Sequence, residues 1–115
     1  LRQYDNSTDP STKENLEKTI HDNRQKIASD VTTKYQALLT ARASYELAVA
    51  EEKIKQKKKK ATQHKLQAGT ASQLEYQQQT YGMSEKKIAT QTAMLNLLTA
   101  WETYQAAING LASVS

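Results

Sequence analysis

A long stretch without helix breakers is the feature that most constrains the fold of this chain. No Pro or Gly occurs from Ser11 to Ala68, and so few breakers leave little room for the turns of a sheet. The Pro directly before Ser11 suits the first position of a helix, and Ser11 with Glu14 fits a capping box. We therefore predict one helix over 11–68, on the order of 80 Å long at 1.5 Å per residue.

The sequence LQAGTASQLE ends this helix and begins another. Gly69 can adopt the left-handed conformation that terminates a helix, and Ser72 with Glu75 forms a second capping box. A link this short requires the two helices to fold back against each other. We predict an all-α fold, a long antiparallel two-helix coiled-coil hairpin. Its parts are an irregular or disordered segment 1–10, a first helix 11–68, a tip 69–72 and a second helix 73–112.

Apolar residues at helical spacing predict which faces meet in the hairpin. In the first helix they are Leu16, Ile20, Ile27, Val31, Leu38, Ala41, Tyr45 and Ala48, continued in a second register by Leu47, Ile54, Ala61 and Ala68. In the second helix they are Leu74, Tyr81, Ile88 and Leu95 at intervals of seven, followed by Leu98, Trp101, Tyr104, Ile108 and Leu111. We predict that these rows form the seam between the helices.

A repeated segment fits this arrangement. LLTARASYELA spans 38–48 and LLTAWETYQAA spans 97–107. With a turn near Thr70, residues whose numbers sum to about 140 face each other in an antiparallel pair. The two copies therefore lie side by side, with Ala and Thr permitting close approach and Tyr and Leu supplying knobs. Apolar residues off the stripe are either scattered surface residues or a second contact face for neighbouring helices; they are Leu39, Leu47, Val49, Met94 and Leu97.

The sequence favours a function without catalysis. It contains no Cys and no GxGxxG, GxxxxGK[ST], GxSxG or HExxH motif. His21 and His64 have no second ligand at helical spacing, so we predict no metal site. Two helices also offer no concave pocket in which the pKa of a catalytic group is tuned. We expect no enzyme activity, no catalytic residue and no cofactor.

A lysine run lies shortly before the predicted tip. The net charge is +4, and much of the excess comes from 53–60, KIKQKKKK. Such a run suggests binding to nucleic acid or to lipid headgroups. On a helix, however, these lysines spread over more than one face, and no aromatic residue interleaves to stack on bases. We predict a solvated segment in which Ile54 and Ala61 maintain the seam, and no nucleic-acid partner.

The order of these features resembles the TolC-like outer-membrane efflux proteins. The resemblance lies in YQALLTARASYELAVAEEKI, HKLQAGTASQLEYQQQTY and KKIATQTAMLNLLTAWETYQAAINGLA. In that family a long Ala-rich helix with periodic Tyr or Leu reaches a Gly-Thr-x-Ser/Thr turn and returns through a second long helix. The similarity covers roughly 16–112, most of the chain.

The resemblance implies a passive conduit for efflux or secretion. Family members are trimers whose hairpins form a tunnel across the periplasm, continuous with a β-barrel in the outer membrane of a double-membraned bacterium. The hairpin tips meet the hairpin of a periplasmic adaptor protein, which links to an energised pump. On this basis Gly69, Thr70, Ala71 and Ser72 form the adaptor-docking tip. Glu75 stands where family tips often carry an acidic residue, and there it lines the entrance and favours cations.

A full family member has two such hairpins and the strands of the barrel. We therefore expect this chain to be an excised piece or a reduced relative, which meets the membrane only through parts outside it. The alternative is a generic coiled-coil interaction module or the hairpin of an adaptor itself. Adaptor hairpins usually carry an Arg-Leu-Ser type tip, and the turn at 69–72 has none.

Overall fold

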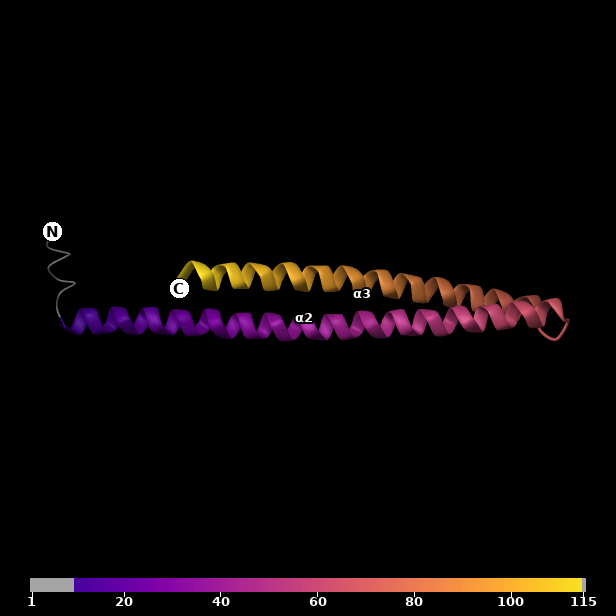
Figure 1. Ribbon diagram of the computed structural model, residues 1–115, viewed down its shortest axis with the longest axis horizontal. Coiled ribbons are helices and arrows are strands. Elements are labelled where there is room, and N and C mark those ends of the chain that lie inside the picture. Colours follow the sequence, from indigo (N-terminus) through magenta and orange to yellow (C-terminus); the bar gives the residue numbers. More distant parts are fainter. Residues whose placement is uncertain (1–9, 115) are drawn as a thin grey trace. The chain divides into compact units, whose positions relative to one another are not determined.

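The computed structural model describes residues 10–114, which form two helices joined by a short turn (Figure 1). α2 runs Pro10–Gln67 over 58 residues, and α3 runs Gln73–Val114 over 42 residues. α2 begins at Pro10, a residue that suits a first helical position, one residue before the predicted bound. Ser11 therefore lies inside the helix, and its prediction as the helix cap is wrong. The remainder of the predicted irregular segment, 1–9, lies outside the described residues. No described residue lies in a strand, and the prediction of an all-α helical hairpin is confirmed.

The described residues divide into two units. Ala37–Trp101 forms the first, called the tip unit below, and the described parts of Leu1–Gln36 and Glu102–Ser115 form the second. In the second unit the rings of Tyr35 on α2 and Tyr104 on α3 have centroids 5.5 Å apart and an interplanar angle of 47°. Tilted aromatic pairs at this distance stabilise a contact by about 0.5–1.5 kcal/mol beyond the area they bury.

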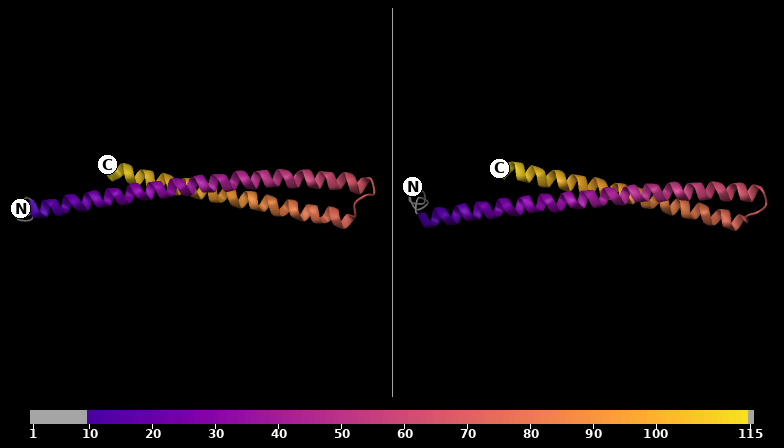
Figure 2. Two further views of the ribbon diagram at one scale, coloured as in Figure 1. Left: turned by 90° about the horizontal axis from the view of Figure 1, so that it is seen from below. Right: turned by 60° about the horizontal axis from the view of Figure 1, so that its bottom comes forward.

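Two polar contacts fix the register of the helices in the tip unit. Lys86 Nζ donates to Glu51 Oε2 at 2.7 Å. Thr90 Oγ1 lies 3.3 Å from the carbonyl oxygen of Ala48 and 2.9 Å from that of Lys86. The residue numbers of the pairs across the helices add up to 137 and 138, close to the predicted sum. Within this unit the two helices cross at a shallow angle (Figure 2).

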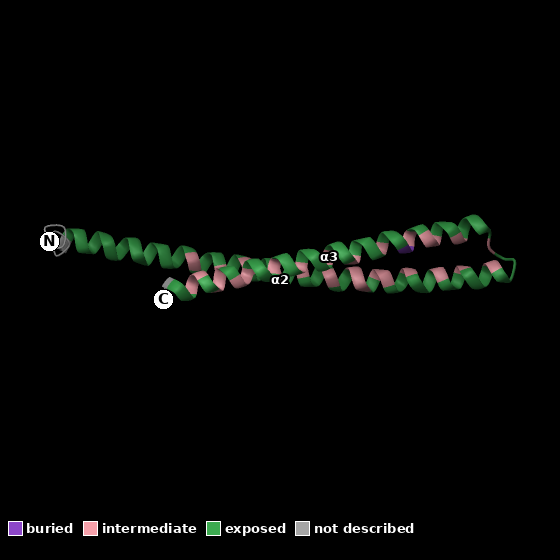
Figure 3. Cartoon of the chain, turned by 90° about the horizontal axis from the view of Figure 1, so that it is seen from above, coloured by how far each residue is buried: buried purple, intermediate pink, exposed green. Residues whose placement is uncertain are grey.

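The repeated segments contribute matching residues to the seam. The first, fourth, eighth and eleventh positions of each copy are half-buried: Leu38, Ala41, Tyr45 and Ala48 in α2, and Leu97, Ala100, Tyr104 and Ala107 in α3. The predicted seam of α2 is thus confirmed from Ile27 to Ala48, and the half-buried residues follow the inner faces in Figure 3. The seam prediction is wrong for Leu16 and Ile20, which are 55% and 44% exposed.

The seam prediction is also wrong for the N-terminal half of α3. The row Leu74, Tyr81, Ile88 and Leu95 is 62–72% exposed. The half-buried or buried row instead comprises Tyr76, Met83, Thr90, Leu97, Tyr104 and Leu111. Both rows repeat every seven residues, and their offset of two residues corresponds to about 200° around the helix. They therefore lie on opposite faces, and heptad spacing alone does not distinguish them. Leu98 and Trp101, also predicted in the seam, are 52% and 47% exposed.

A similar correction applies to α2 beyond Ala48. The predicted second register, Leu47, Ile54, Ala61 and Ala68, is exposed. The half-buried positions are Val49, Glu51, Glu52, Lys55, Lys59, Thr62 and Leu66. Lysines can occupy such positions because their aliphatic stems cover apolar surface while the ammonium groups stay in water. Ile54 and Ala61 therefore do not maintain the seam through the lysine run.

The hairpin has very little buried interior. Among the described side chains only Met83 is buried, at 7% exposure, and it lies in the seam row of α3. Thirteen large hydrophobic residues of the described chain are exposed. Two helices bury one stripe of each, and everything outside that stripe faces outward.

Candidate functional site

The predicted docking tip is a tightly bonded helix end. Gly69 has φ +80°, the left-handed conformation that favours glycine. Its N–H donates to the Leu66 carbonyl at 3.1 Å, and the Thr70 N–H donates to the Lys65 carbonyl at 2.8 Å. These two bonds define a Schellman motif. The predicted role of Gly69 in ending the first helix is confirmed.

The carbonyl oxygen of Lys65 holds the rest of the turn. It accepts from the Thr70 N–H, from the Ala71 N–H at 3.2 Å and from Thr70 Oγ1 at 3.2 Å. A single acceptor thus organises two successive residues of the tip. The side chain of Thr70 also bonds to this carbonyl. The turn is therefore held by hydrogen bonds among neighbouring residues of the chain.

Ser72 caps the start of α3, which is one of the two bonds of the predicted capping box. Ser72 Oγ accepts from the Glu75 N–H at 3.1 Å, and the Ser72 carbonyl accepts from the Tyr76 N–H at 3.2 Å. A serine in this position satisfies one of the backbone donors that a helix start leaves unpaired. The Glu75 carboxylate lies in the first turn of α3, where the helix dipole favours negative charge.

The tip presents small, uncharged groups to solvent. Gly69, Thr70 and Ser72 are exposed and Ala71 is half-buried. A Cβ added at Gly69 would meet no atom within 4 Å, so the space beside this residue is open. The structure brings the four predicted tip residues together on one turn. Glu75 follows one helical turn later and is exposed.

The lysine run contributes a contact that sequence reasoning did not identify. The side chain of Lys55 crosses α3 at Gly82, where a Cβ would overlap the Cε and Nζ atoms of the lysine. Gly82 therefore permits close approach by a side chain of α2 rather than by a neighbouring backbone. The sequence feature that could have indicated this contact is a glycine inside a helix, because glycine there costs about 1 kcal/mol of stability relative to Ala.

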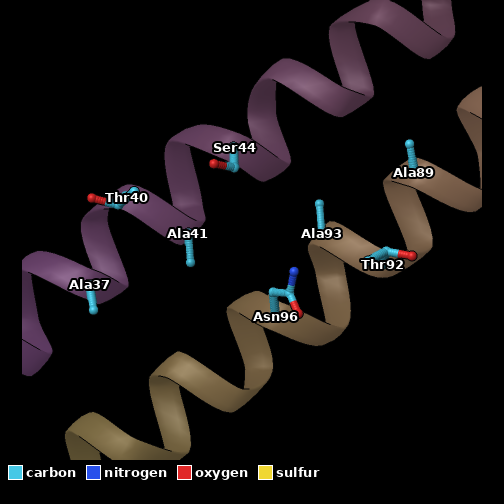
Figure 4. Close-up of a pocket in the computed structure, with 8 residues that line it drawn as sticks. All are labelled: Ala37, Thr40, Ala41, Ser44, Ala89, Thr92, Ala93 and Asn96. Atoms are coloured by element: carbon cyan, nitrogen blue, oxygen red, sulfur yellow. The ribbon is translucent and has the colours of Figure 1, made fainter.

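A groove between the helices was not predicted from the sequence either. It occupies about 610 Å³ on one side of the tip unit (Figure 4). Its walls are small residues from both helices: Ala37, Thr40, Ala41, Ser44, Ala89, Thr92, Ala93 and Asn96. Ala41, Ala93 and Asn96 point into the space between the helices in Figure 4. The sequence feature that could have indicated the groove is that most of these residues directly precede a seam residue.

His21 and His64 are exposed, and no group of three or more His, Cys, Asp or Glu in the described part is placed to hold a metal ion. Neither helix, over its described length, has a segment both long and apolar enough to cross a membrane. No protein-family model, curated protein or solved structure matches the chain.

Proposed function

We propose that this chain is a helical hairpin of the periplasmic tunnel of a TolC-like outer-membrane channel, and that its tip docks a periplasmic adaptor protein. The intact protein acts as a trimer and as a passive conduit for efflux or secretion. The observation that supports the proposal is the tip: an uncharged Gly-Thr-Ala-Ser turn, exposed except at the half-buried Ala71 and closed by local hydrogen bonds.

The chemistry of the turn suits contact with another hairpin tip. The small side chains at 69–72 let a partner backbone come close, and the hydroxyl groups of Thr70 and Ser72 are already bonded within the turn. Because the turn is already fixed by the Lys65 carbonyl, docking costs little conformational entropy. Glu75, one turn further, gives the entrance a carboxylate.

Binding of the adaptor to tip variants tests the proposal. Gly69→Arg introduces bulk and charge at the contact, and we expect the dissociation constant for the periplasmic adaptor of the same bacterium to rise at least about tenfold. Gly69→Asn tolerates the left-handed conformation without the bulk, so it should bind nearly as tightly as the parent. Gln78→Arg, an exposed change further along α3, controls for the added charge.

Circular dichroism of each variant establishes that the hairpin is intact. Equal affinities of the parent and Gly69→Arg, with the helix content preserved, would remove the tip from the docking surface. An adaptor that binds all variants weakly and equally would contradict the channel assignment itself.

A further inference from the structure

Positive charge is concentrated in the part of the hairpin next to the tip. Residues 53–87 contain nine lysines and two glutamates, a formal charge of +7, whereas the rest of the chain has seven Lys and Arg against ten Asp and Glu, a formal charge of −3. No Asp or Glu occurs between Glu52 and Glu75. A field of one sign over such a segment raises the local concentration of small anions.

A hollow on one side of the tip unit brings three of these lysines together. It has a volume of about 250 Å³, and it is lined by Lys59 and Lys60 of α2, by Lys87 of α3, and by Gln56 and Gln63. We call it the basic hollow. The lysines thus come from both helices, and the two glutamines add amide groups that donate hydrogen bonds.

The antiparallel arrangement directs these lysines toward each other. Side chains on a helix lean toward its N-terminus, so Lys59 and Lys60 lean away from the tip and Lys87 leans toward it. Contacts across the helices join residues whose numbers add up to 137 and 138, which places Lys87 level with residue 51 of α2. The lysines therefore start about eight residues apart, roughly 12 Å, and lean into the space between them. Met83, which also lines the basic hollow, lies midway.

The lysines of the basic hollow have no acidic partner in the described part of the chain. No carboxylate of a described residue lines the hollow. Glu52 lies two turns before Lys59 on α2, and Glu85 lies about 200° around α3 from Lys87. Within residues 10–114, Lys59, Lys60 and Lys87 form no ion pair. Their three ammonium groups are therefore available to a ligand.

A second hollow in the tip unit provides a comparison. It has a volume of about 240 Å³, and its lining includes Glu51, Lys58 and Lys86. There Glu51 accepts from Lys86 at 2.7 Å, so one lysine charge is neutralised within the hollow. Lys58 precedes Lys60 by two residues and lies about 200° around α2 from it. It therefore carries the same charge at nearly the same height on a different side of the helix.

From these observations we infer that the basic hollow binds the phosphate of a small ligand that carries one or two phosphate groups. A phosphate monoester carries about −1.5 to −2 charges at pH 7, so three ammonium groups match one or two of them. Ammonium groups are strong donors to phosphate oxygens. The volume equals that of about eight water molecules, which suits a group of this size. The inference goes beyond the proposed function and does not depend on it.

Isothermal titration calorimetry with inorganic diphosphate at constant ionic strength tests the inference on the 115-residue chain. Lys60→Gln removes one ammonium group of the basic hollow, and we expect the dissociation constant to rise about three- to fivefold. Lys58→Gln removes the same charge at an exposed residue of the other hollow. It should change the constant by less than about 1.5-fold, because salt screens a charge outside the contact. Circular dichroism establishes that both variants keep their helix content.

The two methionines of the chain provide a local probe of the same site. Met83 lines the basic hollow, whereas Met94 lines a separate hollow and lies roughly 16 Å further along α3. In NMR spectra of the chain labelled with carbon-13 at the methionine methyl groups, diphosphate should shift the Met83 signal and leave the Met94 signal unchanged. The variant Met94→Leu assigns the two signals.

Vesicles distinguish the two sources of a phosphate group. Phosphatidic acid presents a phosphate monoester on the surface of phosphatidylcholine vesicles. Sedimentation of the chain with such vesicles, reduced more by Lys60→Gln than by Lys58→Gln, would assign the phosphate to a lipid headgroup. Diphosphate binding without sedimentation would assign it to a soluble ligand.

Four results overturn the inference. The first is a parent chain that does not bind diphosphate. The second is an equal loss of affinity in Lys60→Gln and Lys58→Gln, which indicates diffuse attraction by the whole lysine run. The third is an equal shift of both methyl signals. The fourth is duplex DNA that binds more tightly than diphosphate and leaves the Met83 signal unchanged, which assigns the lysines to a nucleic acid.

Discussion

Replacing Met83, the one buried side chain among the described residues, tests which heptad row of α3 faces α2. Met83 is 7% exposed and lies in the observed seam row, whereas Tyr81 is 72% exposed and lies in the row that sequence periodicity favoured. Burying a Met side chain contributes about 1.5–3 kcal/mol, and truncating it leaves a cavity in addition. The seam is shallow, so we expect Met83→Ala to lower the free energy of unfolding by about 2 kcal/mol, at the lower end of core truncations. Tyr81→Ala should change it by less than about 0.5 kcal/mol.

Urea unfolding followed by circular dichroism at 222 nm measures both values. All samples should be compared at one chain concentration, because any self-association would add stability that depends on concentration. For a chain of this size, a loss of about 2 kcal/mol in the free energy of unfolding lowers the melting temperature by roughly 10 °C. If Tyr81→Ala costs more than Met83→Ala, the seam has been assigned to the wrong row of α3.

Three further changes probe local contacts, each measured by the same unfolding assay. Gly82→Ala replaces a helix glycine that costs about 1 kcal/mol of stability relative to Ala, but the new Cβ would displace the Lys55 side chain. The full gain in stability should therefore appear only when Gly82→Ala is combined with Lys55→Ala. A full gain from Gly82→Ala alone would show that the Lys55 side chain does not cross α3 at this residue. Ser72→Ala should destabilise by about 1 kcal/mol through loss of the cap on the Glu75 N–H, and an unchanged midpoint would show that the cap is dispensable. The buried Oε1 of Gln79 accepts no hydrogen bond from any described residue, so Gln79→Leu should stabilise by about 1 kcal/mol; a loss of stability would imply an unrecognised donor.

The helices and the tip could be predicted because local signals determine them. The lack of Pro and Gly up to Ala68, a glycine able to adopt φ +80° and a serine three residues before Glu75 each act over one or two turns. The backbone bonds at Gly69 and the cap at Ser72 follow from these residues with no help from the rest of the chain.

The choice of the seam row in α3 could not be predicted in the same way. Rows through Tyr81 and through Met83 are both periodic, and the row through Tyr81 is the more uniformly apolar because the other contains Thr90. What separates them is the partner helix. Three residues after Thr90, Leu97 and Tyr104 stand Ala93, Ala100 and Ala107, whose small side chains leave room for α2. Thr90 itself finds a carbonyl across the seam. The hydrophobicity of the residues in a row reflects neither the room left by the alanines nor the hydrogen bond of Thr90.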